Sequence, residues 1–333
     1  MIHEKEIMLD HGEGGAATQR LVETLFFKHF GAPEVAEDAT IVPSEARIAV
    51  TTDSFVVKPL EFPGGNIGKL SVCGTVNDLA VMGAIPKYLT AGFILEEGLS
   101  LEVLERLVKA MAETAKEAGI AIIAGDTKVV GRDEADGIFI NTTGIGFVPL
   151  QRTLSSANCQ PGDAIIVSGT IAEHGMAVMV ARQGFGISGD LHSDCQPLAD
   201  LVENILEAVP ETHCMRDPTR GGIATTLLEI ATASKVGMTL KEVAIPLRRP
   251  VRAACDLLGI DPLYVASEGR LLAIVPEEKQ EEALLAMRRH PRGKDASIIG
   301  YVTVTPKGLY LETKSGGNRP LIALEGAQLP RIC

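Results

Sequence analysis

The chain of 333 residues contains no cysteine pair with CxxC spacing. A zinc knuckle or a thioredoxin-like motif is therefore unexpected, and the six scattered cysteines are expected to be reduced cytoplasmic thiols. Residues 1–6 carry no apolar secretory core. The sequence also has no apolar run long enough to span a bilayer. Together these absences predict a cytoplasmic protein.

Basic residues are in deficit. The chain has 31 Lys and Arg against 43 Asp and Glu, a formal net charge of −12. Binding to nucleic acid or to an anionic membrane surface needs clustered Lys and Arg, so both partners are disfavoured. An acidic protein can still bind ATP when Mg²⁺ bridges its carboxylates to the phosphates.

The sequence has no internal repeat, and its length favours about two domains, with a boundary at residues 151–162. Apolar periodicity predicts helices over residues 17–30, 68–83, 101–118, 198–209, 222–234 and 277–289, and strands over residues 47–57, 120–124, 137–148, 163–168, 269–275 and 298–304. This order predicts two α+β domains of similar size, without the regular alternation of a doubly wound sheet. After Tyr310 the chain is expected to be irregular.

Three aspartates lie within or just after apolar segments, namely Asp53, Asp78 and Asp126. Mg²⁺ takes oxygen ligands, and one or two carboxylates with substrate phosphates suffice. The alternative for each aspartate is a helix cap or a turn. Asp126 is the least typical of a cap, because it stands between Gly125 and Lys128.

Glycine-rich segments at residues 12–15, 63–69 and 217–222 offer backbone N–H groups to phosphate oxygens. None is a Walker A loop, since Lys69 is followed by Leu70 and the glycine spacing differs. Each could equally be a turn. The segment 217–222 is the most specific, because it joins an acid, a base and two glycines at a predicted helix start, and it contributes Thr219 and Arg220 as candidate phosphate contacts.

Seven segments together carry a family resemblance. They are residues 62–69 (FPGGNIGK), 77–78 (ND), 83–86 (GAIP), 92–98 (GFILEEG), 125–130 (GDTKVV), 216–222 (RDPTRGG) and the terminal 330–333 (PRIC). The chain resembles the hydrogenase-maturation carbamoyl dehydratase family (HypE-type), within the aminoimidazole ribonucleotide synthetase-like (PurM-like) ATP-binding superfamily. The terminal Pro-Arg-Ile-Cys is the most specific of these segments.

The resemblance implies a two-domain α+β fold. Residues 1–150 would bind ATP and dimerise, their sheet completing a β-barrel across a homodimer. Residues 151–325 would form an α/β sandwich domain, and residues 326–333 a flexible tail. ATP and Mg²⁺ would lie near the dimer interface against the C-terminal domain. Further implied partners are a carbamoyltransferase and an iron-carrying scaffold complex that receives cyanide.

The resemblance also implies site residues. Asp53, Asp78 and Asp126 would form the metal and phosphate shell. Three further residues, Lys58, Asn66 and Lys69, would contact phosphates.

The implied reaction is the ATP-dependent dehydration of an S-carboxamide on Cys333 to an S-cyanate, which supplies cyanide for the iron of nickel–iron hydrogenase. Phosphorylation turns the poor thiocarbamate leaving group into phosphate, and loss of the amide protons then gives the nitrile. Lys128 and Glu268 are the proton-handling candidates, because a buried Lys–Glu pair can have pKa values near neutrality. The alternative is a structural ion pair.

The tail would be exposed without nucleotide and inserted once ATP is bound and Cys333 is carbamoylated. The pair His174-Gly175 is predicted to lie in a loop, with an active-site edge as the alternative. The remaining cysteines are expected to be packed thiols: Cys73, Cys159, Cys195, Cys214 and Cys255.

Other functions stay open at this point. A purine-pathway synthetase would also use ATP on an amide oxygen, although it gives no role to Cys333. A selenophosphate synthetase would need a reactive cysteine near the N-terminus, and residues 1–20 contain none. A non-catalytic scaffold that binds hydrogenase-maturation partners would show no ATPase activity.

Overall fold

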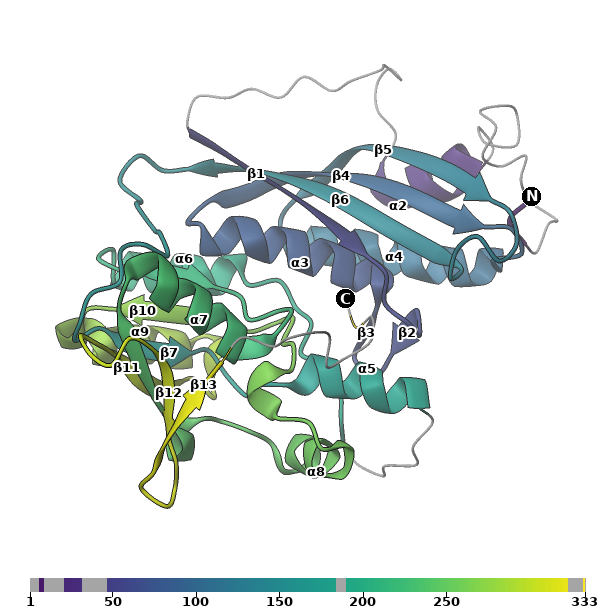
Figure 1. The fold of residues 1–333 in the computed structure, drawn as a ribbon. Coiled ribbons are helices and arrows are strands. Elements are labelled where there is room, and N and C mark those ends of the chain that lie inside the picture. The colour runs from purple at the N-terminus through teal and green to yellow at the C-terminus, as the bar shows by residue number, and fades with distance from the viewer. Residues whose placement is uncertain (1–5, 9–20, 32–46, 184–189, 323–331, 333) are drawn as a thin grey trace.

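The computed structural model describes residues 6–8, 21–31, 47–183, 190–322 and 332. They form two large sheets, one in each half of the chain, and one two-stranded sheet, with helices packed between and around the large sheets (Figure 1). No helix in these ranges is long and apolar enough to cross a membrane.

The N-terminal sheet has four strands in the order β1-β6-β4-β5. Only the β4–β5 pair is parallel. The strands are β1 (Arg47–Phe55), β4 (Ile85–Glu96), β5 (Ala121–Val130) and β6 (Ile138–Val148). A short hairpin of β2 (Glu61–Phe62) and β3 (Gly65–Asn66) follows β1.

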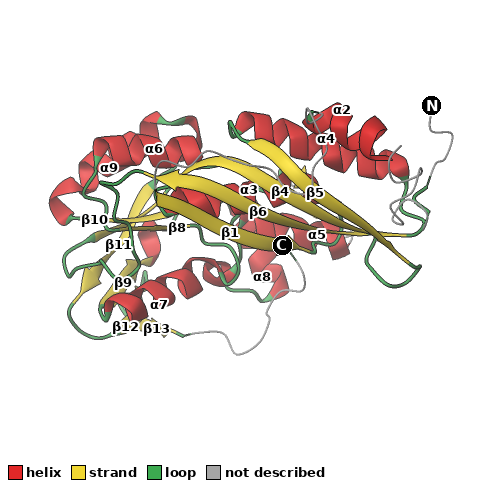
Figure 2. Cartoon of the chain, turned by 90° about the horizontal axis from the view of Figure 1, so that it is seen from above, coloured by secondary structure: helices red, strands yellow, loops and turns green. Residues whose placement is uncertain are grey.

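The two faces of this sheet have different surroundings. The helices α3 (Ile67–Val81) and α4 (Leu101–Glu117) cover the inner face. Because side chains alternate along a strand, the other residues point to an outer face, onto which Figure 2 looks down. That face exposes apolar side chains, with Ile48 at 48%, Val50 at 64% and Ile94 at 43%.

The C-terminal sheet has seven strands in the order β13-β12-β9-β11-β7-β10-β8. They are β7 (Ala164–Val167), β8 (Cys214–Arg216), β9 (Gly237–Lys241), β10 (Leu272–Val275), β11 (Ser297–Thr303), β12 (Gly308–Glu312) and β13 (Asn318–Leu321). The helices of this half are α5 (Glu173–Gln183), α6 (Ala199–Ala208), α7 (Gly222–Ser234), α8 (Arg249–Leu258) and α9 (Gln280–Arg289).

The helix α3 joins the two halves. Nearly all of its residues are buried, because the N-terminal sheet lies on one side of it and α6 on the other. Its Asn77 side chain accepts a hydrogen bond from the Leu198 amide at 2.8 Å and donates to the carbonyls of Gln196 and Glu268 at 3.1 and 3.3 Å. The C-terminal end of α3 is thereby fixed to the segment that precedes α6 and to the residue Glu268.

Most predicted elements are confirmed, including the α7 helix at its predicted bounds. The strand predicted at 120–124 is longer and less buried than expected, because β5 lies at the edge of the sheet with its outer side open. The loop prediction for His174 is wrong, since His174 is the second residue of α5. The tail is not wholly irregular after Tyr310, because β13 pairs with β12.

Candidate functional site

A cluster of carboxyl groups lies on the inner face of the N-terminal sheet, where the two halves of the chain meet. Asp53 comes from β1, Asp78 from the last turn of α3, and Asp217 from the segment that follows β8. Thr51, also on β1, donates a hydrogen bond of 2.9 Å to the Asp78 carboxylate.

These carboxyl groups repel one another. Burial, and next the charge of Asp78, raise the pKa of Asp53. Burial also raises the pKa of Asp78. The pKa of Asp217 is raised to about 7 by burial and by the neighbouring Asp78. A cation would relieve this repulsion, and one buried Asp217 oxygen, Oδ2, has no hydrogen-bond partner.

The residues present fit Mg²⁺ that is held together with phosphates. Within the described ranges, no group of three or more His, Cys, Asp or Glu side chains is placed to hold a metal ion by itself. Mg²⁺ prefers such open arrangements, because it keeps waters and uses substrate phosphates as further ligands. Asp217 was not among the predicted ligands, although its position in the RDPTRGG segment was the available signal.

The segment 217–222 leads into α7 beside the carboxyl cluster. Gly221 and Gly222 have φ values of +81° and +59°, which favour glycine. A side chain at Gly222 would also meet the Leu263 and Val265 carbonyls at 2.6 and 2.7 Å. The positive charge of Arg220 acts on Asp53 and lowers its pKa, against the larger effect of burial. The half-buried Thr219 and the exposed Arg220 therefore lie at a helix start suited to an anion.

Glu268 is held from several sides. Its backbone N–H donates to Asp194 Oδ1 at 3.0 Å, and the next residue, Gly269, packs so tightly that a side chain there would overlap the Asp194 carbonyl. The side chain is buried and its Oε1 lacks a hydrogen-bond partner. Burial, with the nearby Cys195 and Asp217, raises the pKa of Glu268 well above its usual value. This carboxyl group therefore binds a proton more tightly than the carboxyl group of an exposed glutamate does.

Asp126 and Lys128 lie on the opposite, outer face. They pair with Gly92 and Ile94 of β4, so their side chains point away from α3. Both are exposed, at 73% and 66%, and the Lys128 ammonium lies 3.9 Å from the Asp126 carboxylate. Within one chain, therefore, Asp126 does not join Asp53 and Asp78, and Lys128 does not pair with Glu268.

The three further phosphate candidates, Lys58, Asn66 and Lys69, form contacts within their own part of the fold. Lys58 forms an exposed ion pair of 2.9 Å with Asp136. Asn66 caps α3 by accepting the Lys69 amide at 3.0 Å. The Lys69 ammonium donates to the Gly64 carbonyl at 3.3 Å, and its charge acts on Cys195.

The end of the chain returns to the junction of the two halves. Cys333 lies outside the described residues, but Ile332 is only 6% exposed and belongs to the main hydrophobic core. The Ile332 carbonyl lies 2.7 Å from Nε2 of the fully buried His174. The five other cysteines are buried and free, as predicted.

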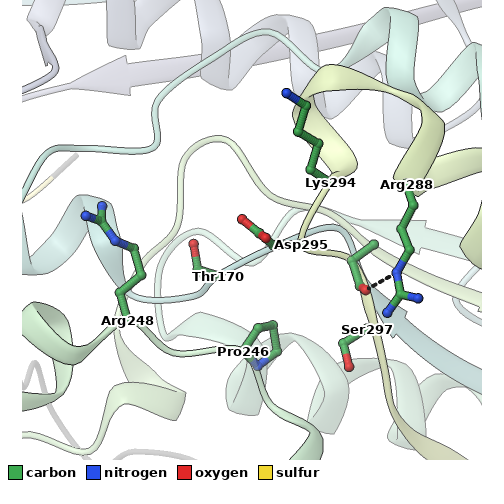
Figure 3. A pocket seen from close by; sticks show the side chains of 8 residues that line it. Thr170, Pro246, Arg248, Arg288, Lys294, Asp295 and Ser297 are labelled. Carbon is green, nitrogen blue, oxygen red and sulfur yellow. Dashed lines mark hydrogen bonds between the residues drawn. The ribbon is translucent and has the colours of Figure 1, made fainter.

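A separate open groove lies on the C-terminal domain (Figure 3). It is lined by Thr170, Pro246, Arg248, Arg288, Lys294, Asp295, Ala296 and Ser297. Arg248 is already paired with Glu173 and Asp190 at 3.0 Å. None of the carboxyl groups of the cluster lines this groove.

Comparisons with known proteins match nearly the whole chain to one family. The N-terminal and C-terminal domains of the AIR synthase related proteins match residues 36–148 and 160–310. The carbamoyl dehydratase HypE of Azotobacter vinelandii is 50% identical, over 97% of this chain and 96% of the relative.

Solved structures agree as well. A hydrogenase maturation protein HypE in complex with ATP superposes with a TM-score of 0.95 at 46% identity, over 98% of this chain and 99% of the other. The structure of a HypE–HypF complex matches with a TM-score of 0.81 at 45% identity, over 92% and 99% of the two chains. On this likeness, which extends over nearly the full length of both chains, the protein belongs to the HypE carbamoyl dehydratase family of the AIR synthase related proteins.

Proposed function

We propose that this chain is an ATP-dependent carbamoyl dehydratase that converts an S-carboxamide on its own Cys333 into an S-cyanate, the cyanide source for the iron of nickel–iron hydrogenase. One observation carries the proposal beyond family membership. Residues 193–195 contact both the end of the chain, through Ser193 and His174, and the buried Glu268, through Asp194. The residue that precedes Cys333 is thus tied to the same short segment as the carboxyl that can move a proton.

The chemistry proceeds in two steps. The carbonyl oxygen of the thiocarbamate attacks the terminal phosphate of ATP, which releases ADP and forms an imidate phosphate as one N–H proton is lost. The C–O bond then breaks, phosphate leaves, and the second N–H proton is lost to give S–C≡N. Glu268 accepts a proton from nitrogen, because its raised pKa makes its carboxylate a stronger base than an exposed one.

The carboxyl cluster supplies the nucleotide side of the site. Asp53, Asp78 and Asp217 would hold Mg²⁺, which neutralises phosphate charge when bound. Thr219 and Arg220 would orient the phosphates at the start of α7. Burial at the junction of the two halves excludes water, which would otherwise hydrolyse the activated intermediate.

Asp126 and Lys128 take part through a homodimer in this proposal. The outer face of the N-terminal sheet exposes Ile48, Val50 and Ile94, and a second copy would cover it by completing a β-barrel. Asp126 and Lys128 lie on that face, so they would act in a site that both subunits build. Lys128 would then handle protons alongside Glu268 of the partner subunit.

The proposal includes two kinds of partner. The solved HypE–HypF complex supports a carbamoyltransferase that delivers the carboxamide, and an iron-carrying scaffold complex would receive the cyanide. Residues 326–333 would serve as the tail that brings Cys333 to each, following an ATP-binding domain of residues 1–150 and a second domain of residues 151–325.

Tandem mass spectrometry of the C-terminal peptide tests the proposal. After incubation with the carbamoyltransferase, carbamoyl phosphate and Mg²⁺-ATP, we expect a carbamoyl adduct on Cys333 that then loses one water. Cys333→Ser should bind ATP normally and form no nitrile. Water loss from an adduct on any other cysteine would overturn the proposal.

A further inference from the structure

A short relay of hydrogen bonds ends at the last peptide group of the chain. The Cys195 amide donates to Ser193 Oγ at 3.0 Å. Ser193 Oγ lies 2.8 Å from His174 Nδ1, and His174 Nε2 lies 2.7 Å from the Ile332 carbonyl oxygen. The ring of Phe62 meets the imidazole edge-on, with centroids 5.3 Å apart.

The partners fix the proton positions along this relay. A carbonyl oxygen can only accept, so Nε2 of His174 carries hydrogen. Burial lowers the pKa of His174 to about 4, so the ring is neutral and Nδ1 is an acceptor. Ser193 therefore donates its hydroxyl hydrogen to Nδ1 while it accepts from the Cys195 amide. Both ring nitrogens are occupied, which leaves His174 no free nitrogen for substrate or metal.

We propose that His174 is a positioning residue: its Nε2–H holds the Ile332 carbonyl and thereby fixes where the next residue, Cys333, is presented for dehydration. The inference rests on the proposed function. Ile332 is bonded directly to Cys333, so a fixed Ile332 carbonyl leaves the cysteine few torsions before its sulfur. Ser193 acts through His174 by setting the ring tautomer.

The relay explains why a histidine is buried at this position. Its charge would be costly there, since burial disfavours the ionised ring. A neutral imidazole instead satisfies two partners at once, and a buried polar group with both partners made is tolerated. His174 lies in the first turn of the buried helix α5, whereas Ile332 is 158 residues away in the sequence.

Two substitutions separate the hydrogen bond from packing. His174→Leu removes both ring nitrogens, whereas His174→Gln keeps an N–H donor at about the reach of Nε2. Val251→Ala is the matched control, because Val251 is fully buried in α8, which packs on α5, and makes no part of the relay.

The first readout is the rate at which iodoacetamide alkylates Cys333 in the full chain, followed by mass spectrometry. The five buried cysteines serve as internal references. We expect His174→Leu to raise the rate about three- to tenfold, the effect of losing one hydrogen bond, while His174→Gln and Val251→Ala stay within about twofold of wild type. An unchanged rate in His174→Leu, or an equal rise in Val251→Ala, would overturn the proposal.

The second readout separates the two reaction steps. His174→Leu should accept the carbamoyl group at the wild-type rate but form nitrile more slowly at saturating Mg²⁺-ATP. His174→Gln should restore the rate of nitrile formation. If His174→Leu does not fold, Ser193→Ala tests the proposal instead. It removes the hydroxyl that donates to Nδ1 and sets the ring tautomer, so it should raise the alkylation rate of Cys333 by a smaller factor. Alkylation of Cys333 does not depend on the dehydration reaction. A wild-type protein without dehydratase activity would therefore refute the proposed function and leave the alkylation test intact.

Discussion

At the scale of single residues, the site consists of acids whose pKa values are raised by burial and by their mutual repulsion. Glu268 is buried with one oxygen unpartnered, and Asp217 and Asp194 are buried close by, with pKa values raised to about 7 and about 6. The family resemblance implied roles for Glu268, Asp53 and Asp78. Their mutual repulsion could not be predicted, because it depends on β1, α3 and β8 converging from distant parts of the chain.

Glu268→Gln should stabilise the fold at alkaline pH. The folded-state pKa of Glu268 lies well above its unfolded value, so stability is fully present below the unfolded pKa and is lost as pH rises toward the folded one. Glutamine cannot ionise and escapes this loss. In urea unfolding, the gain over wild type should be near zero at pH 4 and grow by pH 8, with nitrile formation abolished.

The exposed Glu278 is the control. Glu278→Gln should change stability by less than about 0.5 kcal/mol at either pH. A Glu268→Gln protein that loses stability relative to wild type between pH 4 and pH 8 would show that Glu268 is ionised in the fold.

Asp217→Asn should have opposite effects on the free and the nucleotide-bound protein. At pH 8 it removes a buried charge and should raise the Tm of the free protein. It should also weaken Mg²⁺-ATP binding by about tenfold, or about 1.4 kcal/mol, as measured by calorimetry. Wild-type Mg²⁺-ATP affinity in both Asp217→Asn and Asp78→Asn would exclude this cluster as the metal site.

At the scale of elements, periodicity predicted the helices α3, α4, α6, α7 and α9, but it missed the helices α5 and α8 and the strands β4, β8, β9, β12 and β13. The helix α5 is buried on nearly all sides along its first two turns, so it shows no polar face to mark it. The strand β4 contains Pro86 and Gly92, which are unusual inside a strand, and the register shift between Pro86 and Tyr88 accommodates the proline.

The helix α3 offers a test of how the halves are joined. Asn77→Ala leaves the Leu198 amide and two carbonyl groups without their partner, which should cost about 2–4 kcal/mol. Asn66→Ala removes only the cap of the same helix and should cost about 1 kcal/mol. Urea unfolding compares the two directly. An Asn77→Ala cost no larger than that of Asn66→Ala would mean that these contacts between the halves contribute little.

At the scale of the whole molecule, the sequence predicted two α+β domains but not which residues would meet between them. The pairing of Lys128 with Glu268 fails in one chain because the two lie on opposite sides of the N-terminal sheet. Side chains alternate along a strand, but this alternation places Asp53 and Asp126 on opposite faces of the sheet only when the register of β1, β6, β4 and β5 is known. The sequence does not give that register. The proposed homodimer would reunite them through a second copy.

The exposed apolar face of the N-terminal sheet allows this assembly to be tested. Val50→Glu places a charge on β1 at a side chain that is 64% exposed, so the single chain should fold normally. Burying that charge in a dimer would cost several kcal/mol, so sedimentation should detect monomers. Val243→Glu is the control, because Val243 is 72% exposed on the C-terminal domain. If Lys128 acts across the dimer, Val50→Glu loses nitrile formation and Val243→Glu keeps it. A monomeric Val50→Glu protein with full activity would confine the site to one chain and exclude Lys128 from it.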